Sequence, residues 1–248
     1  MSQQPRVLVP VAVLEGEGLP ETVVPVLSGL SVVVLGYHVL PEQTPTEQGR
    51  MEFEALAEEK LADVTDAFGA DAEVESRIVF THDLEQTLDR VAAETDATAY
   101  LIPNPSGPVE RVLVPVHPEV DLDRLATHVA ALVGDTDVEV TVLRALADPD
   151  AAEPLVSEAL DALVDAGVPP ERLQRAVRET DAPVRTTATL ASEHDLVVMG
   201  ERAPSLRTLV FGEDPEVVAE LSVGPVLVVR RADDPAPPAD ESEPSGEN

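Results

Sequence analysis

The chain has 248 residues, with 48 acidic against 16 basic side chains, so its formal net charge is −32. A surface this acidic repels phosphate backbones, which excludes ordinary binding of DNA or RNA. The chain has no cysteine, which excludes disulfides, thiol catalysis and thiolate zinc sites. Hydrophobic residues make up 44% of the chain, too many for a wholly disordered acidic protein.

The charge itself has two possible explanations: a local acidic function such as cation binding, or adaptation of the whole surface to concentrated salt. Acidic residues occur all along the chain, and Lys60 is the only lysine. At molar salt the Debye length is about 3 Å, so the repulsion between acidic side chains is screened. The pattern favours a protein of a halophile and predicts a melting temperature that rises with KCl.

The N-terminal segment shows no targeting signal. It has a single arginine and a short apolar run that Pro10 interrupts. Such a run is too short to span a bilayer and lacks the layout of a signal peptide. We therefore expect a cytoplasmic protein without membrane insertion.

The hexapeptide RVLVPV occurs twice, at 6–11 and again at 111–116. Six identical residues at matching places predict two tandem copies of one unit. We expect a first domain over 1–105 and a second over 110–231. The remaining segment, 232–248, is rich in acids and proline and is predicted to be disordered.

The first copy is predicted to alternate strands and helices. Its apolar runs predict strands near 6–13, 31–38, 74–80 and 98–103, with helices near 50–68 and 83–95. The first of these helices should bury one apolar face, made of Phe53, Leu56, Leu61, Val64 and Phe68. Pro25 predicts that the segment 19–30 forms only a short or broken helix. This copy is degenerate: either it has lost a final helix and strand, or the first strand of the second copy takes that place.

The second copy shows the same alternation more regularly. Strands are predicted near 111–116, 137–144, 172–178, 195–199 and 225–230, and helices near 121–133, 152–166, 182–193 and 214–222. Strands that are apolar on both faces are typical of a parallel sheet covered by helices. The sequence therefore predicts an α/β fold of two tandem, doubly wound, Rossmann-like parallel-sheet domains.

Three stretches of the second copy resemble the universal stress protein family. They are the opening strand RVLVPV, the segment ASEHDLVVMGERA at 191–203 and the last strand GPVLVVRR at 224–231. With the order of elements, they cover nearly all of 110–231, whereas the first copy matches only through RVLVPV and the element order. The resemblance implies an adenine nucleotide alpha hydrolase-like fold, a role in the stress response and, with the composition, a halophilic archaeal source.

Some members of that family bind ATP through Gly, two residues, Gly, nine residues, then Gly followed by Ser or Thr. The resemblance places Gly200 at the first glycine and Gly212 at the third, but Ala203 replaces the second and Glu213 the hydroxyl residue. His117 stands where the family has an aspartate after the first strand. A carboxylate 4 Å from a phosphate opposes binding by about 4 kcal/mol at an effective dielectric constant near 20.

These departures favour a regulatory protein that acts by binding and dimerisation, with a degraded ATP site. We expect no catalytic residue, no metal site and no cofactor. One alternative is an ATP-binding or slowly ATP-hydrolysing switch, in which Gly200, Arg202 and Gly212 hold the phosphates and His117 is a further candidate. Another is a soluble regulator of a membrane transporter, because related domains occur fused to permeases.

The final strand is expected to mediate assembly. Val226, Leu227 and Val228 lie in an apolar segment that we expect to be an edge strand. In the family this strand commonly forms the dimer contact, so the resemblance implies pairing here too. Both a homodimer and an intrachain pseudo-dimer of the two copies remain open, and the sequence identifies no other protein partner.

Overall fold

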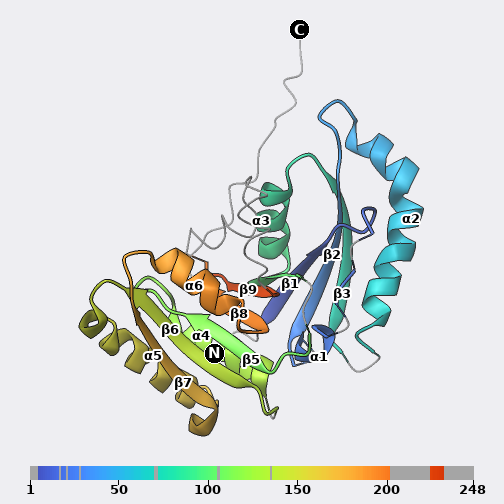
Figure 1. Ribbon diagram of the computed structural model, residues 1–248. Coiled ribbons are helices and arrows are strands. Elements are labelled where there is room, and N and C mark those ends of the chain that lie inside the picture. Colours follow the sequence, from blue (N-terminus) through green and yellow to red (C-terminus); the bar gives the residue numbers. More distant parts are fainter. Residues whose placement is uncertain are drawn as a thin grey trace.

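The computed structural model describes residues 5–16, 18–20, 22–27, 29–69, 72–104, 107–134, 136–201 and 224–231. Its nine strands form one sheet in the order β3-β2-β1-β4-β9-β8-β5-β6-β7 (Figure 1). The strands are β1 Arg6–Val11, β2 Ser31–Val39, β3 Val74–Thr81, β4 Ala99–Ile102, β5 Arg111–Pro115, β6 Glu139–Leu146, β7 Leu173–Glu179, β8 Leu196–Gly200 and β9 Val226–Val229. The helices are α1 Val24–Leu27, α2 Thr46–Asp66, α3 Leu84–Glu94, α4 Leu122–Val133, α5 Glu153–Asp165 and α6 Pro183–Ala191, with short 3₁₀ turns at Pro149–Ala151 and Pro170–Arg172. The predicted helix at 214–222 and the tail at 232–248 lie outside the described residues.

The two RVLVPV segments occupy matching places in the sheet. Each forms a strand, β1 or β5, between the second and the fourth strand of its own half. Even the register agrees, since Val7 pairs with Ala99 of β4 and Val112 pairs with Leu196 of β8. All pairings within the halves are parallel, as the apolar strands predict.

The two halves are joined through β9. This strand runs parallel to β8, with Leu227 opposite Val198, and antiparallel to β4, with Leu227 opposite Leu101. Both edges of β9 are therefore paired within the chain, and the expectation of an edge strand is wrong. Hydrophobicity alone could not reveal this, because it does not show which other strand lies beside β9.

The same pairing corrects the account of the degenerate first half. One of the two explanations offered by the sequence gives the missing place next to β4 to the first strand of the second copy. The structure instead puts β5 between β8 and β6, and places β9, the last strand of the chain, beside β4. The first half thus uses a strand of the second half as its neighbour.

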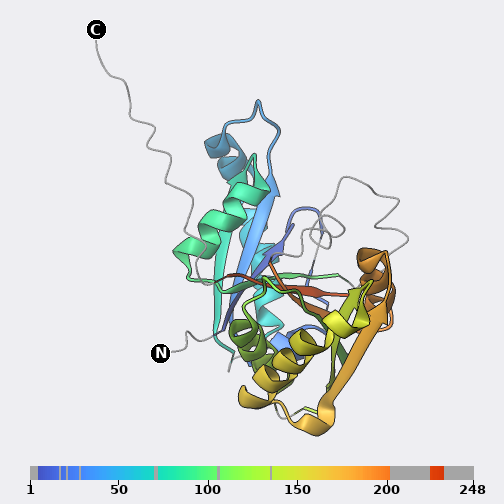
Figure 2. The same ribbon diagram turned by 90° about the vertical axis from the view of Figure 1, so that its left-hand side faces the viewer.

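Helices cover both faces of the sheet (Figures 1 and 2). One face carries α1, α2, α4 and α5, and its buried core runs through both halves, from Val9 and Leu61 to Val129 and Leu163. The other face carries α3 and α6, with Leu88 among its buried residues. We call the contact between the two halves, which includes the pairing of β4 with β9, the join. Because one core extends across the join, the halves share buried apolar surface as well as backbone hydrogen bonds.

Most predicted elements agree with the structure within a few residues. α1 has only four residues, as Pro25 predicts, while α2 begins at Thr46, four residues earlier than expected. The predicted apolar face of α2 is wrong at Leu56, which is 48% exposed, although Leu61 and Val64 are buried. Among the described residues, no helix is long and apolar enough to cross a membrane.

Contacts outside the sheet also join the halves. A Cβ atom built on Gly29, which follows α1, would lie 2.6 Å from the carbonyl oxygen of Ala131 on α4. Real Cβ atoms essentially never come closer than 3.0 Å to another heavy atom. The close approach of the two segments at this point therefore depends on glycine.

Candidate functional site

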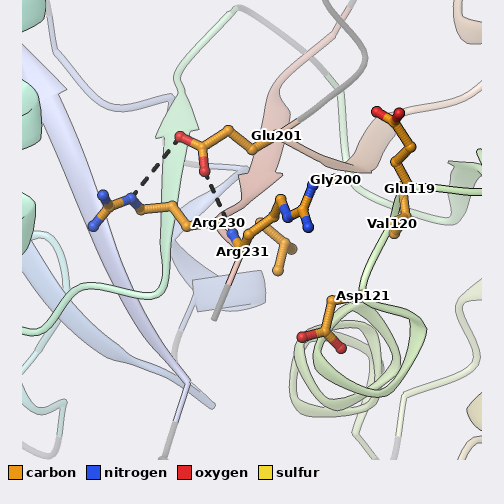
Figure 3. A pocket seen from close by; sticks show the side chains of 8 residues that line it. Glu119, Val120, Asp121, Gly200, Glu201, Arg230 and Arg231 are labelled. Carbon is orange, nitrogen blue, oxygen red and sulfur yellow. Dashed lines mark hydrogen bonds and ion pairs between the residues drawn. The ribbon is translucent and has the colours of Figure 1, made fainter. Parts of the chain in front are cut away.

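A small hollow lies where β8 and β9 end and where the loop after β5 leads into α4 (Figure 3). It is lined by Glu119, Val120, Asp121, Gly200, Glu201, Val229, Arg230 and Arg231. In an open parallel sheet, ligands bind at the carboxyl ends of the strands beside the point where the strand order reverses. Here the chain goes from β5 to β6 on one side and reaches β8 on the other, so the hollow lies at such a point.

Gly200 is packed tightly against the loop after β5. A Cβ atom at this position would lie 2.8 Å from Cγ2 of Val120, closer than real contacts allow. The hollow beside it has a volume of about 10 Å³, which is room for about one water molecule. The glycine at this position is thus explained by the approach of Val120, and the space that the described residues enclose beside it is about that of one water molecule.

The carboxylate of Glu201 is held by groups from both halves. It accepts a hydrogen bond of 2.7 Å from the hydroxyl of Tyr100 on β4, and another of 3.4 Å from the backbone nitrogen of Arg231. The guanidinium of Arg230 lies 3.9 Å away, and the Arg230 and Glu201 side chains are only 11% and 10% exposed. Figure 3 shows this carboxylate turned toward Arg230, on the side away from Asp121.

The antiparallel join explains why the first half reaches this site. Because β9 runs opposite to β4, the carboxyl end of β9 lies at the amino end of β4. Arg230 accordingly donates from its backbone nitrogen to the carbonyl of Thr98 at 2.9 Å, and from Nη1 to the carbonyl of Ala97 at 3.4 Å. The hollow of the second half is therefore bordered by groups of the first.

The start of α4 forms the other wall. Asp121 caps the helix by accepting a hydrogen bond of 3.0 Å from the backbone nitrogen of Arg124, which is the cap that an aspartate at this place predicts. Burial lowers the pKa of Arg124, the charge of Arg230 lowers it further, and the carboxylates of Asp121 and Glu201 partly oppose this. The carboxylates of Asp121 and Glu201 are thus both engaged by groups of the protein itself.

The residues proposed from the sequence are only partly brought together. Gly200 lines the hollow. His117 lies in the exposed loop after β5, where Nδ1 accepts a hydrogen bond of 3.4 Å from the backbone nitrogen of Glu119, and it is not among the lining residues. Arg202 and Gly212 lie outside the described residues, as do Ala203 and Glu213, so their roles stay predictions.

Sequence reasoning missed Tyr100, Glu201, Arg230 and Arg231. The paired arginines close the segment GPVLVVRR and could have been noticed as the basic end of a strand that reaches a ligand edge. Tyr100 carries no such signal, because only the pairing of β4 with β9 brings it to Glu201. Within the described residues, no group of three or more His, Asp or Glu side chains could hold a metal ion.

One comparison with solved structures decides the fold. A universal stress protein from Archaeoglobus fulgidus DSM 4304 superposes over 94% of this chain and 98% of its own, with a TM-score of 0.60 and 18% identical residues. The chain has the fold of a universal stress protein. At this identity the likeness extends to the fold and not to the function.

Two further solved structures match about half of this chain. A universal stress protein from Archaeoglobus fulgidus in complex with dAMP covers 48% of it and 95% of its own chain, with 18% identity and a TM-score of 0.37. A universal stress protein in complex with cAMP covers 49% and 96%, with 23% identity and the same TM-score. These scores are too low to add to the fold assignment. No protein-family model and no curated protein matches the chain.

Proposed function

We propose that this chain is a regulatory member of the universal stress protein family, made of two tandem units that act together as one pseudo-dimer. The observation that carries the proposal is the pairing of β9 with both β8 and β4. The strand that commonly mediates dimers in the family has no free edge left here. A single chain then presents the paired arrangement that other members reach with two chains.

The mass in solution tests this assembly. Size-exclusion chromatography with light scattering in molar KCl should give 26.3 kDa, the mass of one chain. A particle of twice that mass would contradict a closed pseudo-dimer. Salt must be high in this measurement, because we propose a halophilic archaeal and cytoplasmic origin for a chain of net charge −32.

We further propose that the protein binds or regulates without catalysis and that its ATP site is degraded. The support comes from the hollow at Gly200, where Val120 fills the space beside the glycine and the carboxylates of Asp121 and Glu201 are bound within the protein. Calorimetric titration with Mg·ATP in molar KCl should give no heat at millimolar nucleotide, and no phosphate should be released on incubation. Binding with a Kd below 1 mM would contradict a degraded site.

The second candidate is an ATP-binding or slowly hydrolysing switch. It is favoured by the two arginines at the end of β9 and by the amino end of α4, which both border the hollow at the carboxyl edge of the sheet. Purified protein that carries an adenine nucleotide would support this candidate against the first. No contact of the described residues favours a regulator of a membrane transporter, which stays a prediction from the resemblance alone.

A further inference from the structure

A histidine is buried at the contact between the two halves. His128 on α4 is 2% exposed, and its Nε2 lies 2.8 Å from Oγ1 of Thr98, just before β4 of the first half. Its Nδ1 lies 2.8 Å from the carbonyl oxygen of Arg124. Because a carbonyl only accepts, Nδ1 carries the proton and donates, and Nε2 accepts from the Thr98 hydroxyl. The neutral ring thus forms a side-chain hydrogen bond across the join.

Thr98, which directly precedes β4, connects this bond to β1 and to the end of β9 as well. Its hydroxyl lies 3.1 Å from the carbonyl of Arg6 and accepts from the nitrogen of Arg6 at 3.0 Å, which ties it to β1. Its own carbonyl accepts from Arg230 at the end of β9. When Nε2 also takes up a proton, Thr98 can no longer donate to it and must turn its hydrogen toward Arg6. The hydrogen bond then reverses, and a positive charge is placed inside the join.

The surrounding charges disfavour that positive charge. Burial lowers the pKa of His128, and the guanidinium of Arg124 lowers it further, while the hydrogen bond to the Arg124 carbonyl and the charge of Asp121 act in the opposite direction. Around the Thr98 side of the join stand Arg6 on β1 and Arg230 after β9. Glu201, after β8, is engaged by Tyr100 and Arg230.

We propose that protonation of His128 weakens the contact between α4 and the first half, so that the join between the two halves opens in mild acid. The neutral histidine contributes its full stability above the pKa of an unfolded histidine, about 6.5. Because the folded value is lower, that contribution is lost as the pH falls from about 6.5 toward the folded pKa. The proposal does not depend on whether the protein binds ATP.

Hydrogen exchange of the wild-type protein tests the proposal without a variant. Amides of β4 and β9 are compared with those of β2, which lies away from the join, between pH 7.5 and 5 in constant molar KCl. After correction for intrinsic exchange, the protection of β4 and β9 should fall relative to β2, by up to about tenfold per pH unit, since opening binds one additional proton. A ratio that stays constant over this range would overturn the proposal.

Two variants locate the effect at this side chain. In His128→Gln the acid-dependent loss of protection at β4 and β9 should disappear, because the group that titrates is gone. His82→Gln is the matched control, since His82 is exposed and bonds only to the carbonyl of Thr44 among the contacts that the structure gives it, and it should behave as the wild type. Equal acid responses of His128→Gln and the wild type would refute the assignment. If His128→Gln does not fold, NMR titration of the wild-type ring decides, and a pKa at or above 6.5 would overturn the proposal.

Discussion

Substitution of Gly29 by alanine tests the packing between the two halves by adding a single Cβ atom at their contact. The new Cβ would lie 2.6 Å from the carbonyl oxygen of Ala131, whereas ordinary contacts begin at 3.4 Å. The segment after α1 or the backbone of α4 must then move by about 0.8 Å. Such overpacking costs about 1–3 kcal/mol. Alanine also lowers the conformational entropy of the unfolded chain, which raises the free energy of unfolding by about 0.4–1 kcal/mol. We therefore expect a net loss of about 0–2.6 kcal/mol in the free energy of unfolding, and a loss of about 1–3 kcal/mol relative to a glycine-to-alanine variant without the clash.

The assay is urea unfolding in molar KCl followed by circular dichroism, with thermal unfolding as a second measurement. A net loss of this size lowers the melting temperature by up to about 10 °C for a chain of this length. Gly107→Ala is the matched control, because its Cβ would meet nothing within 4 Å and its φ is not positive. The control should be as stable as the wild type or more stable. Equal stability of Gly29→Ala and Gly107→Ala would refute the close approach of the two halves at this point.

Further predictions concern the site and the surface. Tyr100→Phe removes the hydroxyl that donates to the Glu201 carboxylate and should lower the free energy of unfolding by about 1.5–3 kcal/mol in urea titrations, while a loss under about 0.5 would contradict the bond. Gly200→Ala should lower the free energy of unfolding by about 1–3 kcal/mol through its clash with Val120. Adding Val120→Ala should recover part of this loss, whereas strictly additive losses in the double variant would argue against the contact. The melting temperature should rise between 0.1 and 3 M KCl because salt screens the charge of −32, and a flat response would refute adaptation to salt.

The hollow at Gly200 shows what a sequence motif can and cannot predict. The resemblance placed Gly200 at the first glycine of the motif, and in the structure Gly200 ends β8 beside the hollow. The sequence could not predict that Val120 packs on that glycine. The two residues lie 80 positions apart, and the local sequence around one contains no information about the other. For Arg202 and Gly212, which lie outside the described residues, the motif remains the only information.

Local patterns determined the elements of this protein. The repeated RVLVPV predicted two equivalent strands and Pro25 predicted a short helix, because each depends on a few neighbouring residues. Leu56 shows the limit of this reasoning, since a helical period assigns it to the apolar face and yet it is 48% exposed.

Only the tertiary structure decided how the halves meet. The apolar segment at 226–229 could equally have paired with a second chain, and its hydrophobicity is the same in either case. Pairing it with β4 in antiparallel orientation brought Tyr100 to Glu201 and Thr98 to His128, contacts between residues 101 and 30 positions apart. These bonds arise because β4 and β9 run in opposite directions, which places the carboxyl end of β9 beside the amino end of β4. No local sequence pattern predicts this pairing.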